Sequence, residues 1–87
     1  MTTILLVDDD EGLLRTLSMN LRARDYEVLT AATGEEALAA LGEHAVDVVL
    51  LDLGLPGMSG VEVLRRLDRL TGRDVVPVIV LSARHGS

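Results

Sequence analysis

The stretch Ile4-Leu-Leu-Val-Asp-Asp-Asp10 is an apolar run that ends abruptly in three acidic residues. Such a run, with a β-branched residue at each end, is typical of a strand that is covered on both faces in a parallel sheet. The pattern recurs at Val48 to Asp52, and a further apolar run from Val78 to Leu81 ends at Ser82. Because parallel strands end at the same edge of a sheet, we expect the polar residues after these runs to lie together.

The segments between the apolar runs carry helical and strand signals. From Glu11 to Arg24, leucines recur at helical spacing while the arginines fall at other positions, which predicts an amphipathic helix. Glu27 to Ala31 is a short second strand. Thr33 stands three residues before Glu36, the spacing of a capping box, and predicts the start of a helix that Gly42 closes.

A turn-rich stretch, Gly54-Leu-Pro-Gly-Met-Ser-Gly60, leads into a third helix, which we expect over residues 61–70. Strands and helices then alternate from the first run to the last, and each helix is long enough to connect two parallel strands. This order predicts an open α/β sheet in which the helices connect parallel strands. The length of 87 residues allows one domain, which we expect over residues 1–87.

Composition excludes several classes of protein. Fourteen acidic against eight basic residues give a net charge of −6, which opposes direct binding to nucleic acid. The absence of cysteine excludes disulfides and thiolate metal sites and is consistent with a cytoplasmic location. No apolar stretch approaches the roughly 20 residues needed to span a bilayer, so we expect no membrane association. All eight basic residues are arginine, so the chain has no lysine.

The acidic residues after the apolar runs predict a metal site. Carboxylates about 4 Å apart repel each other by roughly 4 kcal/mol at an effective dielectric constant near 20, so Asp8, Asp9 and Asp52 need a compensating cation. Oxygen ligands without histidine or cysteine suit Mg²⁺, which keeps positions open for phosphate oxygens. Asp52 beside this ion could attack phosphorus and form an aspartyl phosphate, while Ser82 offers a hydroxyl to a phosphate oxygen.

These motifs together resemble the receiver domain of bacterial two-component response regulators. Leu-Leu-Val-Asp8-Asp9 is similar to the paired metal-site acids of that family. The segment from Asp52 through Pro56 to Gly60 is similar to its phospho-acceptor loop, and Ser82-Ala83 to its switch hydroxyl and the small residue that follows. The resemblance implies a flavodoxin-like, doubly wound parallel sheet with strand order 2-1-3-4-5.

The resemblance also implies roles for individual residues and partners. Asp52 is the expected phospho-acceptor; Asp9, Asp52 and the backbone carbonyl of Gly54 are the expected Mg²⁺ ligands, and Asp8 acts largely through water. A sensor histidine kinase is the expected phosphoryl donor. The expected output is transcription regulation by a DNA-binding domain of the winged-helix type that lies outside this sequence. We therefore expect a signalling module rather than an enzyme.

The sequence departs from the family pattern at its end. A whole receiver has roughly 120 residues, so we expect this chain to be a receiver truncated after the fourth strand. It lacks the fourth helix, the fifth strand with its phosphate-pairing lysine, and the fifth helix. We expect apolar residues of the first, third and fourth strands to be exposed as a result, and the fourth strand to be an open edge. Self-association or segment exchange through these surfaces is the expected consequence.

Two other functions are compatible with parts of the pattern. A haloacid-dehalogenase-like phosphohydrolase would use Asp8 as nucleophile and Asp10 as acid, although Gly12 stands where that class has threonine or valine. An interaction-only fragment would have lost the phosphoryl chemistry together with the lysine. Asp10 and Glu11 also have a simple structural explanation, because acidic residues stabilise the start of a helix.

Overall fold

The computed structural model describes residues 1–52, 62–63, 65–66 and 76–82, with the side chains of residues 81 and 82 excepted. Residues 62–63 and 65–66 are helical and lie within the third helix predicted from the sequence. The other elements alternate as predicted: β1 (Thr3–Val7), α1 (Glu11–Arg22), β2 (Glu27–Ala31), α2 (Gly34–Glu43), β3 (Val48–Asp52) and β4 (Val78–Ser82).

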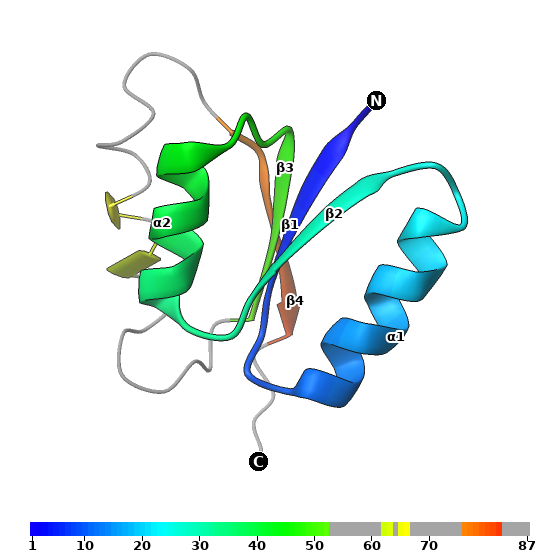
Figure 1. The fold of residues 1–87 in the computed structure, drawn as a ribbon. Coiled ribbons are helices and arrows are strands. Elements are labelled where there is room, and N and C mark those ends of the chain that lie inside the picture. Colours follow the sequence, from blue (N-terminus) through cyan, green and yellow to red (C-terminus); the bar gives the residue numbers. More distant parts are fainter. Residues whose placement is uncertain (53–61, 64, 67–75, 83–87) are drawn as a thin grey trace.

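The strands form one parallel sheet in the order β2-β1-β3-β4. Leu5 of β1 is in register with Leu29 of β2 and with Val49 of β3, so β1 is flanked on both sides. Helices α1 and α2 lie on opposite faces of the sheet (Figure 1). The doubly wound α/β class and the strand order implied by the resemblance are both confirmed for the described strands.

The hydrophobic core has two halves, one on each face of the sheet. On the α2 face, Leu5 and Val7 pack in a cluster that includes Val63 of the third helical segment. On the α1 face, Ile4 and Leu6 pack with Leu14. Successive residues of β1 point to opposite faces, and both faces are covered, which explains why its apolar run has no polar alternation.

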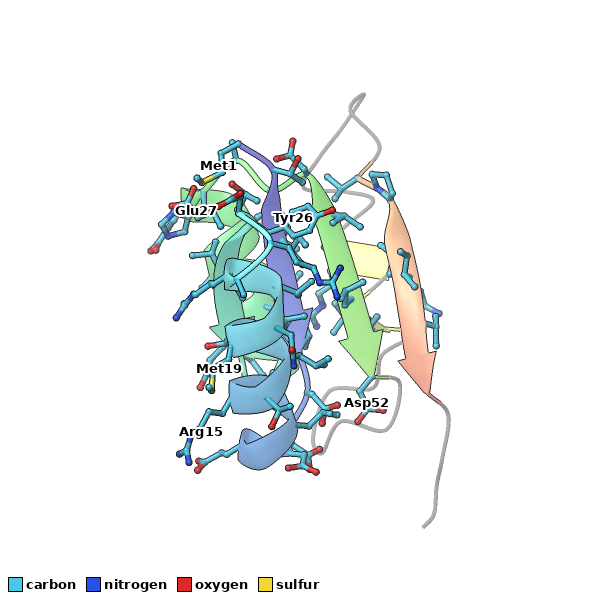
Figure 2. The ribbon with its side chains drawn as sticks, turned by 90° about the vertical axis from the view of Figure 1, so that its right-hand side faces the viewer. Met1, Arg15, Met19, Tyr26, Glu27 and Asp52 are labelled. Carbon is cyan, nitrogen blue, oxygen red and sulfur yellow. The ribbon has the colours of Figure 1, made fainter. Side chains whose placement is uncertain are left out.

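The α1 face of the sheet is only partly covered by the described residues. Leu50 of β3 is half-buried, and its register partner Ile79 of β4 is 55% exposed. Figure 2 shows α1 lying over the β1 and β2 side, with β3 and β4 beside it. The predicted exposure is confirmed for β4 and in part for β3. It is wrong for β1, where Ile4 is 5% and Leu6 0% exposed, because α1 packs on them.

Helix α1 ends two residues earlier than the predicted Arg24. The Asp25 N–H donates to the Arg22 carbonyl and the Tyr26 N–H to the Leu21 carbonyl, a Schellman arrangement that closes the helix. Asp25 has a φ of 70°, the left-handed conformation that glycine usually supplies at this position. The helix therefore ends in a motif that an aspartate closes where glycine is usual.

Helix α2 begins where the capping box predicted. Thr33 Oγ1 accepts a hydrogen bond from the Glu36 N–H at 3.1 Å, and Glu36 Oε1 accepts one from the Ala32 N–H at 2.9 Å. The predicted end at Gly42 is wrong by one residue. The helix continues to Glu43, and His44 follows in an extended conformation with its N–H donating to the Ala40 carbonyl.

Candidate functional site

Three carboxylates meet at the edge of the sheet where the parallel strands end. Asp8 and Asp9 directly follow β1, and Asp52 is the last residue of the neighbouring strand β3. Each offers an oxygen, and these oxygens all lie within 4.8 Å of one another. Figure 2 shows Asp52 at this edge, beyond the end of the β3 ribbon. Strand pairing thus brings together side chains that are 43 or more positions apart in the sequence.

The three carboxylates differ in their exposure to solvent. Asp8 is 2% and Asp52 3% exposed, whereas Asp9 is exposed. Asp8 is also fixed by its own loop, because its Oδ1 accepts a hydrogen bond from the Asp10 N–H at 2.9 Å and its N–H donates to the Ala31 carbonyl at 3.1 Å. The cluster therefore combines two buried acids with one exposed acid, and solvent reaches it at Asp9.

Asp10 takes a separate role at the start of α1. It is the N-cap residue, and its Oδ1 accepts a hydrogen bond from the Leu13 N–H at 3.1 Å. Glu11 follows in the first helical turn, where its charge is favourable to the helix dipole. The simple structural explanation of these two acids is confirmed. Asp10 is not one of the grouped carboxylates. The residue that the phosphohydrolase alternative needs as its acid therefore lies outside this cluster.

The charge and chemistry of the cluster suit a hard divalent cation. At 4.8 Å or less, the buried carboxylates of Asp8 and Asp52, when both are ionised, repel by at least about 3.5 kcal/mol at an effective dielectric constant near 20, whereas water screens exposed Asp9. A cation between the oxygens removes this repulsion. The grouped side chains offer only carboxylate oxygens, the ligand type that Mg²⁺ and Ca²⁺ prefer.

Of the remaining predicted site residues, the structure describes only the backbone of Ser82. The backbone of Ser82 pairs with that of Asp52 across β3 and β4, after a register irregularity between Leu51 and Asp52. Strand β4 therefore ends, at Ser82, at the same edge of the sheet as the carboxylates. Gly54, Pro56, Gly60 and Ala83 lie outside the described residues, so the predicted loop and switch contacts remain predictions.

Ser18 was not among the predicted site residues, and the structure places it in an unusual position. It lies among the leucines of α1, is 6% exposed, and its hydroxyl has no hydrogen-bond partner among the described residues. A serine at the border of the apolar stripe of a helix is only a weak signal, because its burial depends on packing between α1 and β2. It lines a cavity between α1 and β2 that is separate from the carboxylates.

The parallel sheet and its acidic edge define the class of protein. The chain matches the family model of the response regulator receiver domain over residues 4–87. It therefore belongs to the response regulator receiver family. Within the described residues, no helix combines the length and the apolar character needed to cross a membrane.

Curated relatives of the chain include transcriptional regulators. It is 54% identical over all 87 of its residues to the transcriptional regulatory protein KdpE of Mycobacterium tuberculosis. It is 40% identical over 85 residues, or 98% of the chain, to the transcriptional regulatory protein AfsQ1 of Streptomyces coelicolor. The chain spans only 37% of the length of KdpE and 36% of that of AfsQ1.

Solved structures of similar fold come from other receivers. The chemotaxis protein CheY4 of Vibrio cholerae superposes with a TM-score of 0.90 at 31% identity, over 99% of this chain and 72% of CheY4. The response regulator TrrA of Thermotoga maritima, solved in complex with Mg²⁺ and BeF, gives a TM-score of 0.78 at 35% identity, over 92% of this chain and 66% of TrrA.

Proposed function

We propose that this chain is a phosphorylation-dependent signalling module in which Asp52 accepts a phosphoryl group from a phosphohistidine of a sensor histidine kinase. The single observation that carries the proposal is the grouping of Asp8, Asp9 and Asp52 within 4.8 Å at the ligand-binding edge of a receiver fold.

Asp52 is the acid best placed to act as nucleophile. It ends β3, which is paired with β1 on one side and β4 on the other, so the surrounding sheet fixes its backbone. In the proposed transfer, a carboxylate oxygen of Asp52 forms a bond to phosphorus as the bond from phosphorus to the histidine nitrogen breaks. The leaving imidazole takes up a proton. A nucleophile held in place lowers the entropic cost of this step.

Asp8, Asp9 and Asp52 would hold Mg²⁺, and the carbonyl of Gly54 remains a predicted further ligand. When bound, the ion supplies positive charge that stabilises the transferring phosphoryl oxygens. The presence of Mg²⁺ and BeF in the structure of TrrA supports this assignment. Asp8 is held by the Asp10 N–H, so one member of the ligand set is oriented before the ion arrives.

The proposed output is control of transcription. KdpE and AfsQ1 are transcriptional regulators, and the chain spans little more than a third of each. We infer that Ser82 and Ala83 respond to the phosphoryl group and that a DNA-binding domain of the winged-helix type, outside these residues, carries the output. The proposed place of action is the cytoplasm, where sensor kinases present their phosphohistidine.

Phosphoryl labelling tests the assignment of the nucleophile. The purified chain is incubated with Mg²⁺ and acetyl phosphate, and intact mass spectrometry measures the addition of one phosphoryl group. Asp52→Asn abolishes the addition. The matched control is Asp10→Asn, which makes the same change from acid to amide two residues from Asp8 but keeps a good N-cap. This variant is labelled like the unmodified chain.

Two outcomes would contradict the proposal. Labelling that survives in Asp52→Asn but disappears in Asp8→Asn would identify Asp8 as the nucleophile and favour the phosphohydrolase class. Absence of labelling in the folded chain with Mg²⁺ would favour an interaction-only module.

A further inference from the structure

A cavity of about 370 Å³ lies between α1 and the edge strand β2, away from the three carboxylates. Its lining comes from one face of α1 and one residue of β2: Glu11, Leu14, Arg15, Ser18, Met19, Arg22 and Thr30. The volume falls in the range of small-molecule sites, about 300 to 1,000 Å³. Figure 2 shows Arg15 and Met19 projecting from the same side of α1.

The cavity contains a buried hydroxyl without a partner. Ser18 is 6% exposed, and its Oγ accepts and donates no hydrogen bond among the described residues. A buried polar group normally has a partner in the protein, in water or in a ligand, because leaving it unpaired is unfavourable. The hydroxyl oxygen itself is inaccessible to water as placed, so an occupant of the cavity would bond to it once the Ser18 side chain rotates to another staggered rotamer.

Two arginines bracket this hydroxyl along the helix. Arg15 lies three residues before Ser18 and Arg22 four residues after it, so all three share one face of α1. An Nη atom of Arg22 donates to the Val28 carbonyl at 3.1 Å, which anchors the guanidinium and leaves other donors available. Within the described part of the chain, neither arginine forms an ion pair.

The edge of β2 supplies further polar groups. The Glu27 N–H and the Ala31 carbonyl both bond toward β1, so alternation along the strand turns the backbone groups of Val28 and Thr30 outward. Arg22 covers the outward carbonyl of Val28, and Thr30 lines the cavity. Glu11 lies two helical turns from Ser18 and disfavours a negative charge only at its own end of the cavity.

We propose that the α1–β2 cavity binds a small anionic molecule, whose carboxylate or phosphate group is held by Arg15, Arg22 and the Ser18 hydroxyl. Arg15 and Arg22 bring two positive charges to the anion. Because the chain as a whole has a net charge of −6, this pair of arginines differs in charge from most of the surface. Such a ligand would give the domain an input that does not depend on Asp52.

Amide chemical shifts during a titration with inorganic phosphate test the proposal. The titration is done on the whole chain in EDTA, with sodium chloride matching the ionic strength, so that the carboxylate cluster binds no metal. We expect saturable shifts at Ser18, Met19, Arg22 and Thr30 and none at Asp52. Acetate in a parallel titration shows whether a carboxylate is also bound.

Substitutions separate this site from general attraction to arginine. Arg15→Gln, Arg22→Gln and Ser18→Ala each raise the apparent Kd for phosphate by about fivefold or more, the effect of losing one hydrogen bond to a charged group. Arg24→Gln, which removes the same charge from a residue outside the cavity lining, leaves the Kd unchanged. Shifts that are absent, spread over the whole surface, or insensitive to the three cavity substitutions would overturn the proposal. Saturation by an acidic peptide but by neither phosphate nor acetate would overturn it as well.

Discussion

Replacing Asp52 by asparagine should stabilise the metal-free protein, although it removes the proposed phospho-acceptor. Asp8 and Asp52 are both buried, and their grouped oxygens are no more than 4.8 Å apart, so their repulsion is at least about 3.5 kcal/mol. Exposed Asp9 adds at most about 1 kcal/mol because water screens it. An amide oxygen accepts hydrogen bonds more weakly than a carboxylate does, which we take to offset about 1.5 to 3 kcal/mol. A net gain of about 2 kcal/mol in the free energy of unfolding remains.

Mg²⁺ should stabilise the unmodified chain more than it stabilises the Asp52→Asn variant. An ion present at 100 times its Kd stabilises the folded state by about 2.7 kcal/mol. If loss of one carboxylate weakens binding about tenfold or more, the same concentration stabilises the variant by about 1.4 kcal/mol or less. The unmodified chain therefore gains more from Mg²⁺ than the variant does.

Thermal unfolding in EDTA and in Mg²⁺ measures both effects. A gain of about 2 kcal/mol corresponds to a rise of roughly 10 °C in Tm for a domain of this size. Asp10→Asn is the matched control, because Asp10 caps α1 and is not one of the grouped carboxylates. A lower Tm of Asp52→Asn in EDTA, or an equal response of both proteins to Mg²⁺, would refute the shared ion site.

Three further predictions concern stability and association. Ser18→Ala raises the free energy of unfolding by about 1 kcal/mol in urea denaturation, since it removes an unpaired buried hydroxyl; a loss of stability would show that the hydroxyl is bonded. Asp25→Gly is more stable than Asp25→Ala by about 1 kcal/mol, because φ is 70° there, and equal stabilities in the same assay would contradict the αL closure of α1. Ile79→Lys lowers self-association in sedimentation velocity with little loss of stability, whereas Met19→Lys, on another exposed apolar residue, does not; equal effects would exclude β4 as the surface.

The strands and the acidic edge could be predicted from the sequence because their signals are local. A strand buried on both faces, such as Ile4 to Val7, reads as an unbroken apolar run, and the first polar residues after it mark the end of the strand. The grouping of Asp8 with Asp52 followed once β1 and β3 were assumed to be neighbours. That assumption came from the family resemblance, since pairing between distant strands leaves no mark on either one.

The ends of the helices were predicted less well because several local solutions compete. Gly42 has the residue type that closes a helix, yet α2 continues through it and the next residue. Asp25 closes α1 in the left-handed conformation that glycine normally takes. Asparagine and aspartate tolerate this conformation better than other residues with side chains, so an aspartate after a helix carries a weaker form of the same signal.

The burial of Ser18 could not be predicted from α1 alone. Whether a position at the border of the apolar stripe is covered depends on how the helix crosses the sheet and on the neighbouring strand. The Arg22 contact with the Val28 carbonyl has the same origin, because it joins α1 to the outer edge of β2. Both features belong to packing between elements, which the periodicity of a single helix does not describe.

The two edges of the described sheet differ in how well they are protected against the addition of another strand. This difference predicts which edge a second chain would use. At β2, an Arg22 guanidinium covers an outward carbonyl, and charge at an edge opposes the addition of another strand. At β4, Ile79 is 55% exposed and, with half-buried Leu50, forms an apolar surface on the α1 face, while Val80 is 45% exposed on the opposite face. Because Ile4 and Leu6 are covered by α1, this surface is confined to the β3 and β4 half of the sheet. We therefore expect a second chain, where one adds to the described sheet, to pair at β4 rather than at β2.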